Sequence, residues 1–149
     1  LGCGSGKTLM QAAEMRQFNH IIGVELLPVL IERAHQNIKR NSQNNKYKNI
    51  NLINAQVENN QWIKELGSII NLSQKSTIFI FNKNSYGSDI LNQSLEITET
   101  TFKNIIYLYQ NPIHSDVLLK RGYEMFAYDS KPSTINKNFK YKLFIKKST

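Results

Sequence analysis

The chain has 149 residues, of which 40% are apolar, and a net charge of +8. This length suits one domain with a shared core, and the composition argues against a disordered chain. No apolar run reaches the roughly 18 residues of a membrane span, and one cysteine, Cys3, excludes an intrachain disulfide. We expect a single domain over residues 1–149, located in the cytoplasm.

The basic balance comes from 19 Lys and Arg residues against 11 acidic ones. The excess is nearly all lysine, is spread along the chain and accompanies many Asn and Ile residues, as a coding bias toward AT-rich codons would produce. Arginine is scarce, although its guanidinium binds phosphates and guanine edges better than lysine does, through two hydrogen bonds at once. We therefore favour a small molecule or a protein as the partner, with nucleic acid as the less favoured alternative and no membrane.

Helical and strand patterns alternate in the first half of the chain. The predicted helices have one apolar stripe each, and the predicted strands are short apolar runs. In chain order the expected elements are a helix at 7–18, a strand at 20–25, a helix at 27–41 with Pro28 in its first turn, a polar loop at 41–48, a strand at 50–53 and a short helix at 60–66.

The alternation continues and then changes at the C-terminus. We expect a strand at 77–81, a helix at 88–102, a strand at 104–109, a helix at 114–121 closed by Gly122, and strands at 123–128 and 139–146 joined by a linker with Pro132. In the last strand Phe139, Tyr141, Leu143 and Ile145 should share one side, with most lysines on the other. The order predicts an α/β fold: a mainly parallel sheet with helices on both faces, closed by an antiparallel strand pair.

A glycine-rich loop opens the chain. Gly2, Gly4 and Gly6 form a G-x-G-x-G run directly before the first predicted helix. Glycine permits positive φ and close approach of a ligand, and the free N–H groups of a helix start face such a loop. A loop of this kind normally follows a strand, and because the sequence starts at Leu1 we expect the first strand to be missing.

Glu25 gives the loop a partner. It ends the second predicted element and stands 19 positions after Gly6. At the carboxyl edge of the sheet, an acidic side chain beside the loop can accept hydrogen bonds from both hydroxyls of a ribose. A glycine loop, a strand and an acidic residue in this order favour a site for a nucleoside-containing ligand over a tight turn that binds no ligand.

Two other nucleotide sites fit less well. The run Gly6-Lys7-Thr8 suggests a P-loop, but Leu1 stands where its first glycine is needed and no strand ending in Asp follows. A dinucleotide loop needs a third glycine where Lys7 stands. A nicotinamide-dependent oxidoreductase therefore remains an alternative of lower rank.

The sequence resembles the class I S-adenosylmethionine-dependent methyltransferases. The resemblance lies in residues 1–6 (LGCGSG), 21–28 (IIGVELLP), 50–57 (INLINAQV) and 78–82 (IFIFN), in the order of that family, and the region after residue 82 looks like a poorly characterised bacterial branch of it. It implies a Rossmann-like methyltransferase fold and methyl transfer from S-adenosylmethionine to an unidentified acceptor.

The resemblance also implies a set of cofactor-binding residues. The loop would lie against the methionine part, Glu25 would hold the ribose and Leu26 would flank the adenine. Gln56 stands where the family has an Asp that accepts from the adenine amino group, and its amide oxygen could accept instead. The full set is Leu1, Gly2, Cys3, Gly4, Gly6, Glu25, Leu26, Gln56, Val57 and Asn82.

The acceptor site is less defined. Asn82 starts the family's fourth motif, but the prolines that follow in amino-methylating branches are absent, so that specificity is not transferred. We expect the acceptor pocket near residues 82–86 and 111–114, at the carboxyl ends of strands. The residues indicate no catalytic base and no metal site, because His20, His35 and His114 are isolated and Cys3 is best explained by its small size. The altered motifs leave a catalytically degenerate binding domain as a further alternative.

Overall fold

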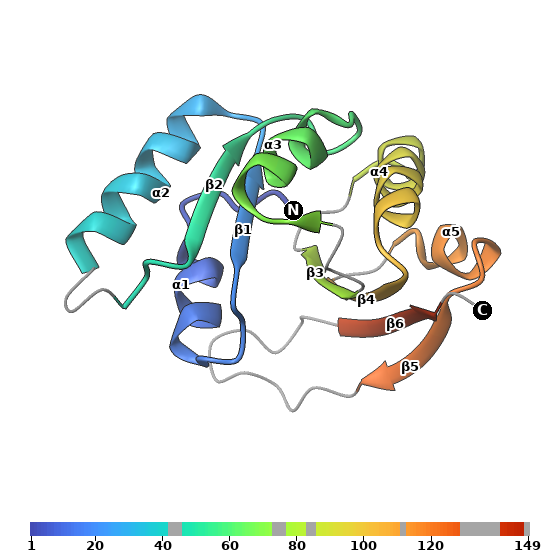
Figure 1. The fold of residues 1–149 in the computed structure, drawn as a ribbon. Coiled ribbons are helices and arrows are strands. Elements are labelled where there is room, and N and C mark those ends of the chain that lie inside the picture. Colours follow the sequence, from blue (N-terminus) through green and yellow to red (C-terminus); the bar gives the residue numbers. More distant parts are fainter. Residues whose placement is uncertain (42–45, 73–76, 83–85, 111–112, 129–140, 148–149) are drawn as a thin grey trace. The chain divides into compact units, whose positions relative to one another are not determined.

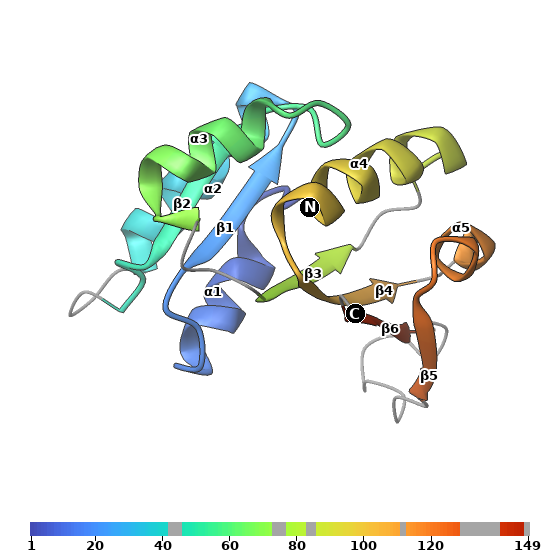
Figure 2. The ribbon, with the colours of Figure 1, turned by 45° about the vertical axis from the view of Figure 1, so that its right-hand side comes forward.

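The computed structural model describes residues 1–41, 46–72, 77–82, 86–110, 113–128 and 141–147. The chain divides into two compact units, residues 1–66 (the N-terminal unit) and 67–149 (the C-terminal unit). Figures 1 and 2 show the order of helices and strands along the chain. The predicted linker at 129–138, the loop residues 42–45 and Phe139 lie outside the described residues.

The N-terminal unit contains two parallel strands. Strand β1 (Ile21–Glu25) pairs with β2 (Ile50–Asn54), and Glu25 stands opposite Asn54 at their carboxyl ends. Helices α1 (Lys7–Glu14) and α2 (Pro28–Asn41) contact these strands and each other. Helix α3 (Gln61–Ile69) follows β2 and contains the unit boundary. The predicted β–α alternation is confirmed here.

Apolar packing holds this unit together. Ala13, Ile21 and Tyr47 form one buried cluster with half-buried apolar side chains around it. In α3, Trp62 is 2% exposed, and its indole N–H donates to the Val57 carbonyl oxygen at 3.1 Å. A buried indole N–H needs such a partner, because an unpaired donor in the core is destabilising.

Helix α1 ends four residues before its predicted end at residue 18. The last turn closes with Met15 and Arg16 donating to Ala12 and Ala13, and Arg16 has a φ of 54°. A residue in the left-handed conformation stops an α-helix. The Glu14 carboxylate also accepts hydrogen bonds from the Lys46 Nζ at 3.0 Å and the Tyr47 hydroxyl at 2.9 Å, and both donors lie outside the helix. The periodic pattern of the sequence contains no sign of these contacts, so the predicted range was wrong at its C-terminal end.

The C-terminal unit contains a four-stranded mixed sheet in the order β3-β4-β6-β5. Strand β3 (Thr77–Asn82) runs parallel to β4 (Asn104–Gln110), while β6 (Tyr141–Lys147) runs antiparallel to β4 and to β5 (Glu124–Tyr128). Helices α4 (Ser88–Thr101) and α5 (Ser115–Lys120) belong to the same unit (Figure 2). The antiparallel C-terminal pair is therefore confirmed, and Gly122, with a φ of 83°, closes α5 as predicted.

The core of this unit lies on one face of the sheet. Ile105, Tyr107 and Tyr109 alternate along β4 and are at most 1% exposed, and Phe144 stands opposite Tyr107 and is fully buried. Phe144 shares its side of β6 with Lys146, whereas Leu143 and Ile145 on the other side are only half-buried. The buried side of β6 is therefore the one that carries lysines, because their long stems cover apolar surface while the charged ends reach outward.

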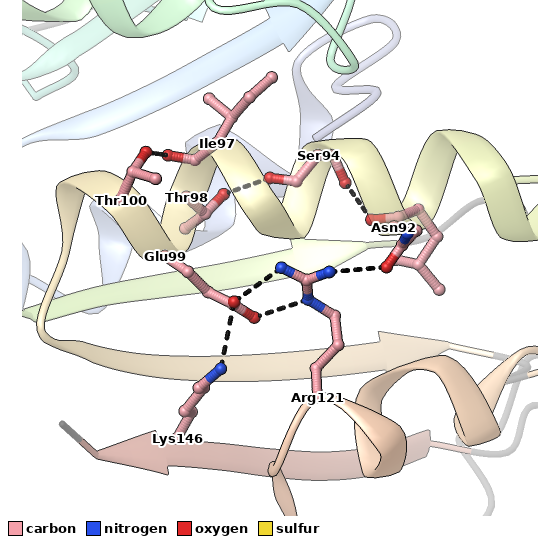
Figure 3. A network of polar contacts seen from close by, with 9 residues as sticks. Asn92, Ser94, Ile97, Thr98, Glu99, Thr100, Arg121 and Lys146 are labelled. Atoms are coloured by element: carbon pink, nitrogen blue, oxygen red, sulfur yellow. Dashed lines mark hydrogen bonds and ion pairs between the residues drawn. The ribbon is translucent and has the colours of Figure 1, made fainter. Parts of the chain in front are cut away.

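A charged network joins the end of β6 to the helices (Figure 3). Glu99 on α4 accepts from the Arg121 Nε at 3.0 Å and Nη2 at 2.8 Å, and the Lys146 Nζ lies 3.1 Å from the same carboxylate. The Nη1 of Arg121 donates to the side-chain oxygen of Asn92 at 2.7 Å. Burial by itself would raise the pKa of Glu99, but Arg121 and Lys146 outweigh it and hold that pKa below its usual value.

We predict that Glu99→Gln lowers the free energy of unfolding at pH 7 by about 1.5–3 kcal/mol, the contribution of a hydrogen bond to a charged group. A carboxylate whose pKa is lower in the folded than in the unfolded state stabilises the folded protein at any pH above its unfolded pKa of about 4.3. This stabilisation is lost as the pH falls further. Urea unfolding of wild type and variant should therefore converge only as the pH falls through the folded pKa of Glu99, which lies below about 4.3. Glu124→Gln, an exposed carboxylate on β5 of the same unit, is the control and should be near neutral. An equal effect of both variants would contradict the network.

Candidate functional site

The glycine loop at residues 1–6 is fixed against the end of β1. The backbone N–H groups of Gly2 and Cys3 both donate to the Val24 carbonyl oxygen, at 2.8 and 3.0 Å, and Gly6 donates back to Cys3 at 3.0 Å. Gly2, Gly4 and Gly6 have φ values of 67°, 54° and 77°. Only glycine adopts this conformation without strain, so all three positions of the motif meet a backbone requirement.

Gly4 and Gly6 face different surroundings. A Cβ added to Gly6 would lie 3.2 Å from the Ala34 Cβ on α2, whereas a Cβ added to Gly4 would meet nothing within 4 Å. Gly6 therefore allows α2 to pack against the start of α1. Gly4 leaves open space beside its backbone, which is what a closely approaching ligand needs.

Glu25 points at this loop. One carboxylate oxygen accepts the Gly4 N–H at 3.0 Å and the other accepts the Leu27 N–H at 3.1 Å, while the residue is 8% exposed. The predicted juxtaposition of loop and carboxylate is confirmed. Each oxygen keeps capacity for a further hydrogen bond, so two donors on one ligand can be accepted side by side.

Two asparagines hold the surrounding backbone, and neither was predicted as a site residue from the sequence. The Asn54 side-chain N–H₂ donates to the carbonyl oxygens of Glu25 and Leu26 at 2.8 and 2.9 Å. The Asn37 side chain on α2 donates to the Ser5 carbonyl oxygen at 3.0 Å. An Asn at the end of a strand or on the inner face of a helix is the only signal in the sequence.

Exposed apolar side chains follow Glu25. Leu26, Leu27 and Val29 are 53%, 51% and 64% exposed. Apolar side chains that the backbone keeps exposed to solvent offer a surface on which a planar nucleobase can pack. This arrangement suits the predicted position of Leu26 beside an aromatic ring system.

Gln56 and Val57 behave differently from each other. Gln56 is exposed just after β2, and its Oε1 accepts from the Asn59 side chain at 3.3 Å. Val57 is 6% exposed, and its carbonyl oxygen is used by Trp62. Its side chain therefore packs in the core, and only Gln56 of this pair presents a polar group at the surface.

Asn82 belongs to the C-terminal unit and is fully buried. Its side-chain N–H₂ donates to the Tyr107 hydroxyl at 2.8 Å, and the Tyr107 and Tyr109 rings meet edge to face at 5.9 Å. Burial raises the pKa of Tyr107. The tyrosines are core residues, as their strand positions indicate. Residues 83–85 and 111–112, where an acceptor pocket is expected, lie outside the described residues.

Other candidate chemistry gains no support from this geometry. Burial raises the pKa of Cys3 to about 11, which makes it a poor nucleophile. Within the described ranges, no group of three or more His, Cys, Asp or Glu residues could hold a metal ion. In the same part of the chain, no helix has the length and apolarity to cross a membrane.

The comparisons with known proteins agree with this geometry. Residues 1–67, which contain the glycine loop, Glu25 and Gln56, match the family model of a methyltransferase domain. No curated protein sequence matches the chain.

The chain is also similar to solved structures. The methyltransferase domain of bacterial CtHen1 shares 16% identity over 96% of this chain and 86% of that chain, with a TM-score of 0.65. The precorrin-6y C5,15-methyltransferase of Geobacter metallireducens shares 14% over 99% and 77%, with a TM-score of 0.65. An rRNA methylase from Streptococcus thermophilus shares 10% over 99% and 83%, with a TM-score of 0.61.

At these identities the structural likeness establishes the fold. The predicted Rossmann-like methyltransferase fold, with its antiparallel C-terminal strands, is confirmed. Over residues 1–67, the match to a methyltransferase-domain model agrees with the resemblance that the sequence shows to methyltransferases.

The loop glycines generate a stability prediction. Gly4→Ala should lower the free energy of unfolding by about 1–2 kcal/mol, the cost of a left-handed L-residue. Gly6→Ala should cost more, because its Cβ also crowds Ala34. Gly67→Ala, inside helix α3 and outside the left-handed region, is the control and should not destabilise, because alanine is the better helix former. Urea unfolding measures all three, and a neutral Gly6→Ala would show that the loop geometry is different.

The raised pKa of Cys3 generates a second prediction. A rise from 9.0 to about 11 leaves roughly a hundredfold less thiolate at pH 8. Alkylation by iodoacetamide should therefore be at least about tenfold slower in the native protein than in urea. Equal rates would mean that the loop does not enclose this thiol.

Proposed function

We propose, from the premise that residues 1–67 belong to a methyltransferase domain on a Rossmann-like methyltransferase fold, that this protein transfers a methyl group from S-adenosylmethionine to an acceptor. The carrying observation is the Glu25 carboxylate directed at the Gly4 N–H within a loop of three left-handed glycines. The proposal includes a cytoplasmic location and membership of the methyltransferase enzyme class.

The residues of the N-terminal unit fit this cofactor. The open space at Gly4 admits a ligand against the backbone. The remaining acceptor capacity of Glu25 matches two neighbouring ribose hydroxyls, and its charge disfavours a phosphate at the same place. The exposed Leu26 and Leu27 supply an apolar surface for adenine. Leu1, Gly2, Cys3 and Gly6 complete the proposed loop contacts.

When bound, S-adenosylmethionine supplies a methyl group already activated by its positive sulfur. What remains for the protein is to align the acceptor with that methyl group and to exclude water. Asn37 and Asn54 contribute by fixing the loop and the Glu25–Leu26 backbone. This chemistry needs a general base only for an acceptor that cannot lose its own proton, so no catalytic base is assigned.

The acceptor remains a small molecule or a protein in this proposal, with nucleic acid as the alternative. The titles of the similar structures name a precorrin enzyme and an rRNA methylase, so they do not agree on one class. We expect the acceptor to be recognised near residues 82–86, at the end of β3.

One observation favours a second candidate, a cofactor-binding domain without catalysis. Asn82 is fully buried and donates to Tyr107, so its amide is engaged within the core. Cofactor binding without turnover over a broad panel of acceptors would favour this candidate. Methyl transfer that survives repurification and disappears in a Glu25→Ala variant would exclude it.

The cofactor is tested by calorimetry on the intact protein. We expect S-adenosylmethionine to bind, and Glu25→Gln to weaken binding by at least about a hundredfold, because two hydrogen bonds to a charged acceptor contribute about 1.5–3 kcal/mol each. Glu32→Gln, an exposed carboxylate on α2, is the matched control and should bind like wild type. Urea unfolding verifies that the variants are folded.

Two results would overturn the proposal. The first is no binding of S-adenosylmethionine at millimolar concentration by folded wild-type protein. The second is tighter binding of NAD than of S-adenosylmethionine, which would indicate a nicotinamide-dependent oxidoreductase instead.

A further inference from the structure

A short chain of side-chain amides lies between β2 and α3. The Asn59 Oδ1 accepts the backbone N–H of Gln61, the first residue of α3, at 3.0 Å. The Asn59 Nδ2 then donates to the Gln56 Oε1 at 3.3 Å. The two bonds link the start of the helix to the exposed Gln56.

The first bond sets the orientation of both amides. A backbone N–H is only a donor, so the oxygen of Asn59 must face Gln61 and its N–H₂ group must face Gln56. Gln56 must then turn its oxygen toward Asn59. Its own N–H₂ group, which has no hydrogen-bond partner within the described part of the chain, is directed away from that contact.

Gln56 borders the site that contains Glu25. Glu25 pairs with Asn54 across the two strands, and the N–H of Ala55 donates to the Glu25 carbonyl oxygen at 3.1 Å. Gln56 is the next residue and is exposed at the same carboxyl edge of the sheet. Ligands of such sheets bind outside the carboxyl ends of the strands, so Gln56 lies at the edge where a nucleoside held by Glu25 would bind.

We propose that Gln56 is a specificity-determining residue that offers the ligand an N–H donor, so that the base is read through an acceptor atom and not through an amino group. The inference rests on the proposed function, since it assumes a nucleoside on Glu25. It reverses the sequence-based expectation that the Gln56 oxygen accepts from adenine, because that oxygen already faces Asn59.

The test compares two ligands by calorimetry: S-adenosylhomocysteine and its deaminated analogue S-inosylhomocysteine, in which a carbonyl oxygen replaces the adenine amino group. A donor at Gln56 gives no advantage to the amino group. Deamination also converts the N1 acceptor of the base into an N–H donor, but the new carbonyl oxygen beside it can accept from Gln56. Wild-type protein should therefore bind S-inosylhomocysteine no more than about threefold more weakly than S-adenosylhomocysteine.

The key variant is Asn59→Asp. An aspartate still accepts the Gln61 N–H and is a good residue at a helix start, but it cannot donate to Gln56. Gln56 must then turn its N–H₂ toward Asp and present its oxygen outward. Preference for S-adenosylhomocysteine should rise about five- to tenfold, the effect of one hydrogen bond. Asn60→Asp adds the same charge one residue away and should leave the ratio unchanged.

Each outcome decides a separate point. A wild-type preference of more than about tenfold for S-adenosylhomocysteine, or no change of the ratio in Asn59→Asp, would overturn the role of Gln56 while leaving the cofactor intact. The same change in Asn60→Asp would attribute the effect to charge alone and would also overturn it. Failure of folded wild-type protein to bind either ligand would instead remove the proposed function.

Discussion

The hydrogen bond from the Gly4 N–H to the Glu25 carboxylate, 3.0 Å long, is the contact on which the candidate site depends. It requires a left-handed backbone at Gly4 and a carboxylate that is nearly buried at the end of β1. A buried charge needs strong partners, and two backbone N–H groups supply them here. The bond therefore stabilises the loop and leaves an acceptor group beside open space.

Side-chain amides organise the surroundings of this contact. Asn37 holds the loop from α2, Asn54 holds the Glu25–Leu26 backbone from β2, and Asn59 orients Gln56 from the start of α3. Each amide carries both a donor and an acceptor, so it can satisfy a backbone group on one side and fix a neighbour on the other. Neutral groups perform this positioning without adding charge near Glu25.

The C-terminal unit is held together in another way. Its sheet buries Tyr107 and Phe144 on one face, and the Glu99 carboxylate is shared by two cations. A shared carboxylate ties α4, the end of α5 and β6 into one unit. Breaking it would leave two partly buried positive charges close together, so we expect the network to be more sensitive than an exposed ion pair.

The sequence by itself determined the order of elements, the glycine loop, the partnership of that loop with Glu25 and the glycine that closes α5, because these follow from local conformation and periodicity. Tertiary structure decided that α1 stops at Glu14, that Asn82 is buried against Tyr107 and that Gln56 turns its oxygen to Asn59. These outcomes depend on which side chains meet after folding. Partners as distant as Glu14 and Tyr47 leave no periodic trace in the chain, so only the packed molecule could reveal them.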